Sequence, residues 1–339
     1  MTPHQYIERE TLSISTEQLY WDRIISFLYS RVRENAPAVF RILTGPRISG
    51  LLGFLNYDCF LTKRVSGNMR FLMDSGMNLD ECLERPDVLD TPKKIFERKI
   101  RYWECRPMCE GRNAVVSPAD ARILVGSLSE SKGIFIKEKF FEYGELFGYC
   151  KKNWLEAFAG GDFAIFRLTP DKYHYNHTPV AGVVKDIYEI EGRYHSCNPN
   201  AVVSTVTPYS KNKRVVTVID TDVMGGSRIG LVAMIEVVAF MIGEIVQCYS
   251  AVRYDNRTEV VKGMFLDRGC PKSLYRPGSS TDILIFQKDR IVFAEDILIN
   301  RYNNKAMSRY TLGFGEPMVE TDVKVRSLIA FPRKNKKED

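Results

Sequence analysis

The stretch "TDILIFQKDRIVFAEDI", residues Thr281–Ile297, carries the clearest structural signal in this sequence. Two short apolar runs stand on either side of a Lys-Asp turn, which predicts two β-strands. From about Asn113 onward the same texture recurs in "RILVGSL", "GIFIKEKF" and the alternating "KRVVTVID", with Gly and Pro between the runs. The preceding part of the chain has helical spacing. We therefore predict an α+β fold, with a helical N-terminal region over residues 1–110 and a β-rich core over residues 111–339.

The composition describes a chain that can bury a large core. Its 339 residues are 45% hydrophobic and 27% charged, and the formal net charge is +6. This mild basic excess is compatible with an anionic surface and does not indicate a nucleic-acid partner. Eight cysteines without a CxxC pair or an apolar signal segment are typical of reduced, intracellular thiols. The apolar run over residues 229–252 contains Glu236 and Glu244, so we interpret it as two buried strands rather than a membrane span.

The N-terminal region has helices edged by basic residues. Apolar residues recur at helical spacing in "YWDRIISFLYSRVREN", residues 20–35, and shorter apolar pieces follow up to residue 58. Arg23, Arg31, Arg41 and Arg47 are among the basic residues that flank them. Two interpretations fit this pattern. The helices can lie in a membrane interface, or they can form an ordinary layer packed on the core.

Three separate turns carry residues suited to chemistry. They are "DKYHYNHTPVAG" with His174 and His177, "VSPADARILVG" with Asp120, and "RPGSSTDILIF" with Ser279 and Ser280. Histidine moves protons near neutral pH, and an aspartate can orient it, as in a Ser-His-Asp set. No further ligand stands at a familiar metal spacing, so no metal is predicted, and no G-x-S-x-G elbow surrounds the serines. The plain alternative is a pair of half-buried histidines, a turn-capping aspartate and an ordinary Gly-Ser turn.

Taken in order, these pieces resemble the phosphatidylserine decarboxylase proenzyme family. The segment from Ile95 to Pro107, "IFERKIR" followed by "RP", is similar to the family's FFxRKLKPxxRP, and "PADA" is similar to PADG. "YHYNHTPVAG" resembles YHRxHxPxxG, "YHSCNPNAV" resembles (L/Y)xSVNPxAV, and "NKRV" resembles NERV. "RGCPKSLYRPGSSTDILIF" resembles KGEEKGYFxFGGSTVxLxF. The resemblance covers most of the chain, and the combination in this order is specific.

The resemblance implies a self-processing, pyruvoyl-dependent enzyme that converts phosphatidylserine to phosphatidylethanolamine and CO2. In the family, a serine attacks the carbonyl before it, the resulting ester undergoes β-elimination, and the new N-terminal residue becomes a pyruvoyl group. Carried onto this sequence, Asp120 and His177 drive the cut, and His174 is implied to contact the substrate or donate a proton. The pyruvoyl group, covalently bound pyruvate, would form a Schiff base with the substrate amine and accept the electrons released with CO2.

The position of the cut follows from an ungapped alignment over residues 268–291. It places the family's GGST on residues 278–281, so Ser280 becomes the pyruvoyl precursor and the scissile bond is Ser279–Ser280. The large β chain is then residues 1–279 and the small α chain residues 280–339. The family has glycine where this chain has Ser279. A cut between Gly278 and Ser279 would restore a Gly-Ser bond, but it shifts the following strand by one residue and reverses its faces, so Ser280 is preferred.

An enzyme that acts on a lipid head group has to work at a bilayer, which favours the interfacial interpretation of the N-terminal region. We expect a peripheral protein on the cytoplasmic side of the cell membrane. Its partners are phosphatidylserine and an anionic surface, and it forms a heterodimer of its own α and β chains, with homo-oligomerisation left open. Three alternatives remain. They are a pyruvoyl decarboxylase of a soluble amino acid, an unprocessed membrane-binding homologue, and a serine hydrolase that keeps one intact chain.

Overall fold

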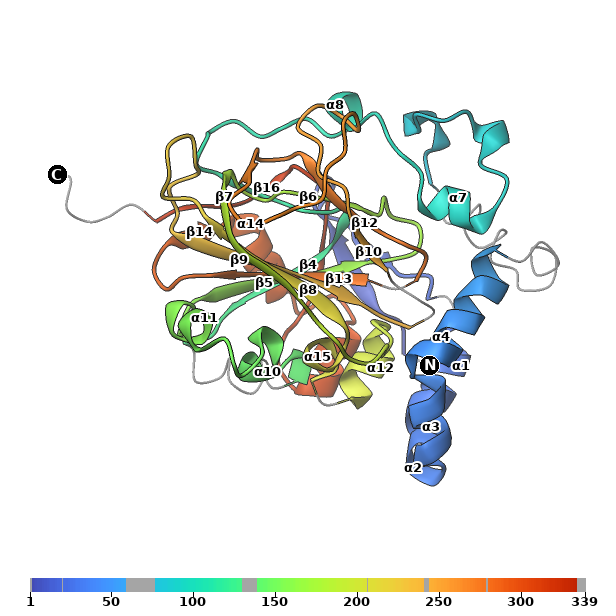
Figure 1. The fold of residues 1–339 in the computed structure, drawn as a ribbon. Coiled ribbons are helices and arrows are strands. Elements are labelled where there is room, and N and C mark those ends of the chain that lie inside the picture. The colour runs from blue at the N-terminus through green and yellow to red at the C-terminus, as the bar shows by residue number, and fades with distance from the viewer. Residues whose placement is uncertain are drawn as a thin grey trace.

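The computed structural model describes residues 2–19, 21–58, 77–129, 139–205, 207–240, 244–278 and 280–333. Within these ranges the core is a ten-stranded sheet in the order β11-β7-β8-β9-β13-β5-β4-β15-β1-β2 (Figure 1). Neighbouring strands are antiparallel except for β1 and β15. The strands are β1 (Gln5–Glu8), β2 (Ile14–Thr16), β4 (Ala121–Ser127), β5 (Asp162–Leu168), β7 (Gly182–Ile190), β8 (Arg214–Asp220), β9 (Leu231–Val238), β11 (Phe265–Leu266), β13 (Ser280–Phe286) and β15 (Thr321–Val323).

Two small sheets accompany the large one. Their orders are β10-β12-β6 and β14-β16-β3. The two strands predicted within residues 229–252 are confirmed as β9 and β10, but they belong to different sheets, and so do β13 and β14 on either side of the Lys-Asp turn. The strands of the small sheets are β3 (Val115–Val116), β6 (Tyr175–His177), β10 (Ile245–Gln247), β12 (Pro271–Tyr275), β14 (Ile291–Phe293) and β16 (Leu328–Pro332).

The strand β13 lies in the middle of the large sheet, between β9 and β5, and all its residues are buried. Leu284 and Phe286 point into an apolar cluster that includes Tyr275 of β12, while Ile283 and Ile285 point into the cluster on the opposite face. A strand buried on both faces reads as a continuous apolar run, because neither face meets water. This explains why the stretch stood out in the sequence.

The first residues differ from the prediction of a wholly helical N-terminal region. They form the antiparallel pair β1 and β2, and β1 adds to the large sheet by pairing in parallel with β15. Ile7 is buried in this ladder. The predicted helices begin only at Asp22, because the short strands before it find a free sheet edge supplied by the far end of the chain.

The predicted N-terminal helices are present and form a helical arm, defined here as residues 21–58, which projects beside the sheet (Figure 1). Pro37 and Pro46 each open a helix, where their missing N–H costs nothing. Nowhere in the described ranges is a helix both long and apolar enough to cross a bilayer. The arm consists of α1 (Asp22–Phe27), the π-helical turn η1 (Leu28–Val32), α2 (Arg33–Asn35), α3 (Pro37–Leu43), α4 (Pro46–Gly53) and the π-helical turn η2 (Phe54–Asp58).

The remaining helices are short and cover the sheets. The helices α10, α11, α12 and α15 pack against one face of the large sheet, and the sheet β10-β12-β6 covers the other (Figure 1). This mixture agrees with the predicted α+β class. The helices are η3 (Leu79–Glu81), η4 (Pro86–Val88), α7 (Pro92–Phe96), α8 (Tyr102–Cys105), α10 (Tyr143–Phe147), α11 (Lys152–Ala157), α12 (Pro199–Ser204), α13 (Pro208–Lys211), α14 (Glu295–Arg301) and α15 (Arg309–Phe314).

Candidate active site

Ser280 opens β13 in the middle of the large sheet, opposite Leu168 of β5 and Val238 of β9. It is 1% exposed, and its hydroxyl makes no hydrogen bond to any residue that the structure describes. Gly278 just before it has a φ of +149°, a backbone conformation that glycine adopts most readily. The other candidate, Ser279, lies outside the described residues. Because buried hydroxyls normally find a partner, the unpaired hydroxyl marks Ser280 as a candidate for chemistry.

The residues around Ser280 are held from both faces of the sheet. Ser280 and Asp282 share one face, since alternate residues of a strand point the same way. On that face the hydroxyl of Tyr275 in β12 donates to Oδ1 of Asp282 over 2.8 Å. Thr281 points to the opposite face, where its hydroxyl donates to the thiol of Cys197 over 3.0 Å. The start of β13, where Ser280 lies, is therefore fixed by one hydrogen bond on each face of the sheet.

His174 lies just before β6, the strand next to β12. Its carbonyl accepts the backbone N–H of Tyr275 over 3.1 Å, and its ring stacks on Phe96 of α7 with the ring centroids 3.5 Å apart. Among the described residues, neither ring nitrogen has a hydrogen-bond partner of regular geometry. Burial, helped by the positive charge of Arg98, lowers the pKa of His174 well below its usual value. A neutral imidazole has one nitrogen that carries a hydrogen and one that can accept a hydrogen bond, and both ring nitrogens of His174 are available for such contacts.

His177 lies in β6, and both of its ring nitrogens are occupied. Nδ1 is 2.9 Å from the carbonyl oxygen of Gly269, and Nε2 is 3.0 Å from the hydroxyl of Tyr173. Because a carbonyl only accepts, Nδ1 carries the proton, and Nε2 accepts from Tyr173. Burial lowers the pKa of His177 to about 3, so the ring is neutral at physiological pH.

Asp120 follows β3 in the "SPAD" turn and is held by a cation. Arg106 donates to its carboxylate through Nη2 over 2.7 Å and through Nε over 3.0 Å, and the backbone N–H of Val325 donates over 2.8 Å. Burial alone would raise the pKa of Asp120, but the guanidinium of Arg106 lowers it below its usual value. The turn touches the histidine strand directly, because the N–H of His177 donates to the carbonyl of Pro118 over 2.7 Å.

The predicted relay residues are therefore brought to the same side of the large sheet. Asp120 is near enough to His177 to influence its pKa, and β12, the neighbour of β6, leads into the turn before Ser280. In the described ranges, however, no hydrogen bond joins Asp120 to the His177 ring or that ring to Ser280. The relay itself stays a prediction.

Sequence reasoning missed a group of buried polar residues behind β13. Lys272 and Glu236 are both 0% exposed, and their charged atoms lie 2.6 Å apart. Asn176 of β6 donates to Glu236 over 3.2 Å, which ties the histidine strand to β9. Asp282 faces Glu236 across the ladder, and burial together with that charge raises the pKa of Asp282 well above its usual value. We call this group the central cluster, and its members are Asn176, Glu236, Gln247, Lys272, Ser273 and Asp282.

A signal for the central cluster existed in the sequence. Glu236 and Asp282 each interrupt an otherwise apolar strand, and a charge in a buried strand demands a partner. The resemblance also places a valine of the family where this chain has Asp282. The partner Lys272 could not be identified, because only the packing of the sheet β10-β12-β6 on the large sheet brings it to Glu236.

A small cavity of about 60 Å³ lies between the sheet and the helical arm. Leu168, the ladder partner of Ser280, belongs to its lining. The lining also includes the segment 196–198 from the "YHSCNPNAV" motif and Trp21 and Ile25 from the arm. The cavity thus lies between the neighbourhood of Ser280 and the helices that were predicted to meet a membrane.

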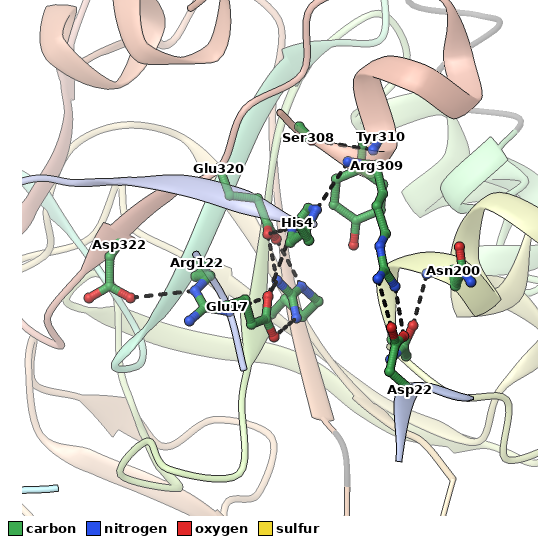
Figure 2. A network of polar contacts seen from close by, with 12 residues as sticks. His4, Glu17, Asp22, Arg122, Asn200, Ser308, Arg309, Tyr310, Glu320 and Asp322 are labelled. Atoms are coloured by element: carbon green, nitrogen blue, oxygen red, sulfur yellow. Dashed lines mark hydrogen bonds and ion pairs between the residues drawn. The ribbon is translucent and has the colours of Figure 1, made fainter. Parts of the chain in front are cut away.

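A second group of buried charges joins the two ends of the chain (Figure 2). Arg167 donates to Glu17 and to Glu320, each over 2.9 Å, and His4 lies 2.7 Å from Glu320. Burial would raise the pKa of Glu320, but Arg167 and His4 lower it to about 2. We call this group the N-terminal cluster, and its members are His4, Glu17, Arg122, Arg167 and Glu320.

The N-terminal cluster includes a possible set of metal ligands. One ligand atom from each of His4, Glu17 and Glu320 lies within 4.8 Å of the others. Both carboxylates are already bound by the guanidinium of Arg167, and Arg122 also pairs with Glu17. Because a cation would have to compete with two guanidinium groups, we interpret the cluster as an ion-pair network.

Comparison with known proteins agrees with the motifs. The family model described as "Phosphatidylserine decarboxylase" matches residues 93–307. A "Phosphatidylserine decarboxylase proenzyme" of Fusobacterium nucleatum is 28% identical over 91% of this chain and 95% of its own length. The protein of the same name from Chlamydia pneumoniae is 30% identical over 88% and 92% of the two chains. "Phosphatidylserine decarboxylase proenzyme 2" of Komagataella phaffii is 30% identical over 74% of this chain but only 23% of its own length.

Proposed function

We propose that this chain, which belongs to the phosphatidylserine decarboxylase family, works through a pyruvoyl group made from its own Ser280. It is a decarboxylase that converts phosphatidylserine to phosphatidylethanolamine and CO2, as its family and its relatives' names indicate. The main support for the proposed cofactor is the hydroxyl of Ser280, which is buried and unpaired at the start of β13. This chain has Ser279 where the family has glycine, and Ser280 and both histidines of the motif are present.

The proposed processing starts when the Ser280 hydroxyl attacks the carbonyl carbon of residue 279 and replaces the amide bond by an ester. Removal of the Cα proton of residue 280 then breaks the ester C–O bond, which releases the carboxylate of residue 279 and leaves dehydroalanine. Tautomerisation and hydrolysis of this residue release ammonia and leave the pyruvoyl group. The cut produces a β chain of residues 1–279 and an α chain of residues 280–339.

His177 is the proposed acceptor of the hydroxyl proton, because its ring is neutral and its Nε2 carries no hydrogen. For this role Nε2 has to exchange its bond to Tyr173 for one to Ser280. Asp120 then stabilises the charged imidazole, as the acid of a Ser-His-Asp set does. Arg106 keeps Asp120 ionised for that purpose.

The pyruvoyl group would supply a carbonyl that binds the substrate amine and accepts the electrons released with CO2. We assign the return of a proton to the substrate Cα to His174. Its ring is held by stacking on Phe96, and its nitrogens are free of strong partners in the described part of the chain. The adjoining cavity, lined by Leu168 and residues 196–198, is the proposed site of the head group.

The helical arm is the proposed contact with the membrane. Phe27 is 59% exposed, and further exposed apolar side chains follow along the arm. Arg23 and Arg31 are exposed on the same helices, and basic residues beside apolar ones favour an anionic bilayer surface. We propose peripheral binding on the cytoplasmic side of the membrane. The exposed large apolar residues of the arm are Ile24, Phe27, Val39, Ile42, Leu51, Phe54 and Leu55.

The first experiment is the intact mass of the purified protein under denaturing conditions. We expect two chains, with the small one beginning at position 280 and bearing a blocked pyruvoyl end. Ser280→Ala should give one full-length chain, while the matched control Ser279→Gly should still be cut at the same bond. One intact chain from folded wild-type protein would exclude the pyruvoyl mechanism. A small chain that begins at Ser279 would move the reactive serine by one residue.

The substrate is tested with vesicles that contain phosphatidylserine, compared with free amino acids. We expect CO2 release from the lipid and none from serine or tryptophan. The comparisons already favour the lipid, since the relatives at similar length are named for phosphatidylserine. Turnover of a free amino acid without vesicles would instead support a soluble decarboxylase.

A further inference from the structure

The helical arm does more than face outward, because its inner side is bonded to the loop that lines the cavity. The hydroxyl of Tyr29 accepts the backbone N–H of Ser196 over 2.7 Å. Asn198 donates to Asp22 over 3.2 Å, and Asn200 donates to Ser26 over 2.5 Å. Three residues of one helical segment therefore hold three alternate residues of the "YHSCNPNAV" motif.

Tyr29 occupies the centre of this contact. It is 1% exposed, lies in the π-helical turn η1, and packs its ring against Phe40 and His195. Such turns put one residue out of the regular helix and are frequent at functional sites. Ile25 and Leu28 of the same segment pack in the apolar cluster that includes Phe240, another residue of the cavity wall.

The loop 196–198 is linked to Ser280 through Cys197 and Thr281. Cys197, between the bonded Ser196 and Asn198, accepts the hydroxyl hydrogen of Thr281 over 3.0 Å. Thr281 directly follows Ser280 in β13. Ser196, Cys197 and Asn198 also line the cavity next to Leu168. A shift of this loop would therefore move both the cavity wall and a contact of the strand that carries Ser280.

The same segment has its other face in solvent. Ile24 and Phe27 of α1 are exposed, one and two positions away from the buried Ile25. A single short helix thus presents apolar side chains outward and bonds the cavity loop on its inner side. The arm side of this contact lies outside residues 93–307, which the family model matches, and the loop side lies within them.

We propose that Tyr29 is a positioning residue, whose hydroxyl fixes the loop 196–198 and through Cys197 and Thr281 the geometry at Ser280. The inference rests on the proposed function. It makes the seating of the helical arm a condition for full turnover, separate from the affinity of the arm for a membrane.

The test uses a short-chain phosphatidylserine dissolved as monomers, so that membrane binding does not enter the rate. Tyr29→Phe removes only the hydroxyl, and we expect kcat per pyruvoyl group to fall about tenfold, with a smaller change in KM, because a lost positioning bond misplaces the reacting groups. Sedimentation with vesicles containing phosphatidylserine should remain as in the wild type, since the hydroxyl is buried.

The matched control is Tyr188→Phe. The Tyr188 hydroxyl likewise bonds to the backbone, in its case as the donor to the carbonyl of Phe147 over 2.9 Å, and Tyr188 does not belong to the cavity lining. We expect its kcat to stay within twofold of the wild type. A second variant, Ser26→Ala, removes the acceptor of Asn200 and should lower kcat about threefold, which keeps the test available should Tyr29→Phe fail to fold.

A purely structural role for Tyr29 would lower the melting temperature and leave kcat per pyruvoyl group unchanged, and that result would overturn the inference. Equal losses in Tyr29→Phe and Tyr188→Phe would overturn it too. The proposed function fails in a different way, with an uncut or inactive wild-type protein. An active wild type beside an equally active Tyr29→Phe and Ser26→Ala refutes the positioning role alone.

Discussion

The central cluster and the N-terminal cluster are both buried in or beside the large sheet, but their charged side chains are paired differently. In the N-terminal cluster, Arg122 and Arg167 face each other across the ladder, and Glu17 binds both. In the central cluster, Glu236 and Asp282 face each other, and of these two acids Lys272 forms an ion pair with Glu236. One cluster is compensated by ion pairs, whereas the other contains, two residues from Ser280, an aspartate whose pKa is raised well above its usual value by burial and by Glu236.

The difference shows what each cluster contributes. Compensated buried charges hold elements together, and the N-terminal cluster ties the first residues to Glu320, which would belong to the other chain after the proposed cut. The Asp282 carboxyl, whose pKa is raised, is not held by an ion pair with any residue that the structure describes, and its titration makes the stability of the fold depend on pH. The following predictions test this distinction, and all are measured as urea unfolding of single chains in the uncut Ser280→Ala background.

The largest effect is expected for Lys272→Met. It leaves Glu236 charged and unpaired in a site that is 0% exposed, so the free energy of unfolding should fall by about 3–5 kcal/mol. The double variant with Glu236→Leu removes the stranded charge and should recover most of the loss. A loss below about 1 kcal/mol in the single variant would contradict the pairing described here.

Arg167→Gln should cost less, about 2–3 kcal/mol, since it breaks charged hydrogen bonds to Glu17 and Glu320. Arg122 still pairs with Glu17, and His4 still contacts Glu320, so neither carboxylate is left alone. If this variant proves more damaging than Lys272→Met, the N-terminal cluster is not the better compensated of the two.

Asp282→Asn should stabilise the protein as the pH rises. The folded protein keeps the Asp282 proton above pH 3.8, where the unfolded chain releases it, so wild-type stability falls with rising pH and the variant escapes this loss. The advantage should grow by up to about 1.4 kcal/mol per pH unit as the pH rises above the pKa of the unfolded carboxyl, and should level off above the raised pKa of the folded one.

Glu320→Gln provides the control of opposite sign. The pKa of Glu320 is lowered from 4.5 to about 2, so its contribution is present above pH 4.5 and is lost as the pH falls toward 2. The destabilisation by Glu320→Gln should therefore shrink on acidification. The same pH trend in both variants would mean that Asp282 is ionised in the fold.

The smallest effect is expected for an exposed pair. Lys94 and Asp90 lie 2.8 Å apart with exposed fractions of 51% and 55%. Lys94→Met should change the free energy of unfolding by less than about 0.5 kcal/mol, because water screens the pair. A larger change would show that burial is not what separates the two clusters from surface ion pairs.

Much of the site could be read from local sequence. The motif turns identify Asp120, His174, His177 and Ser280, and helical spacing identifies the arm. The structure places these residues on one side of the large sheet, yet the partners differ from the predicted relay. Arg106, directly after α8, donates to Asp120, and Tyr173, just before β6, donates to His177. These two groups bind the atoms that the predicted relay would use.

The sequence by itself determined the strand character of β13, since a strand buried on both faces consists mainly of apolar residues, and it determined the family through ordered motifs. Only the tertiary structure decided that β1 pairs with β15, that Lys272 meets Glu236, and that Tyr29 holds Ser196. These contacts join residues far apart in the chain, and their geometry depends on strand register and helix docking. Local spacing encodes neither, because both are set when separate segments pack together.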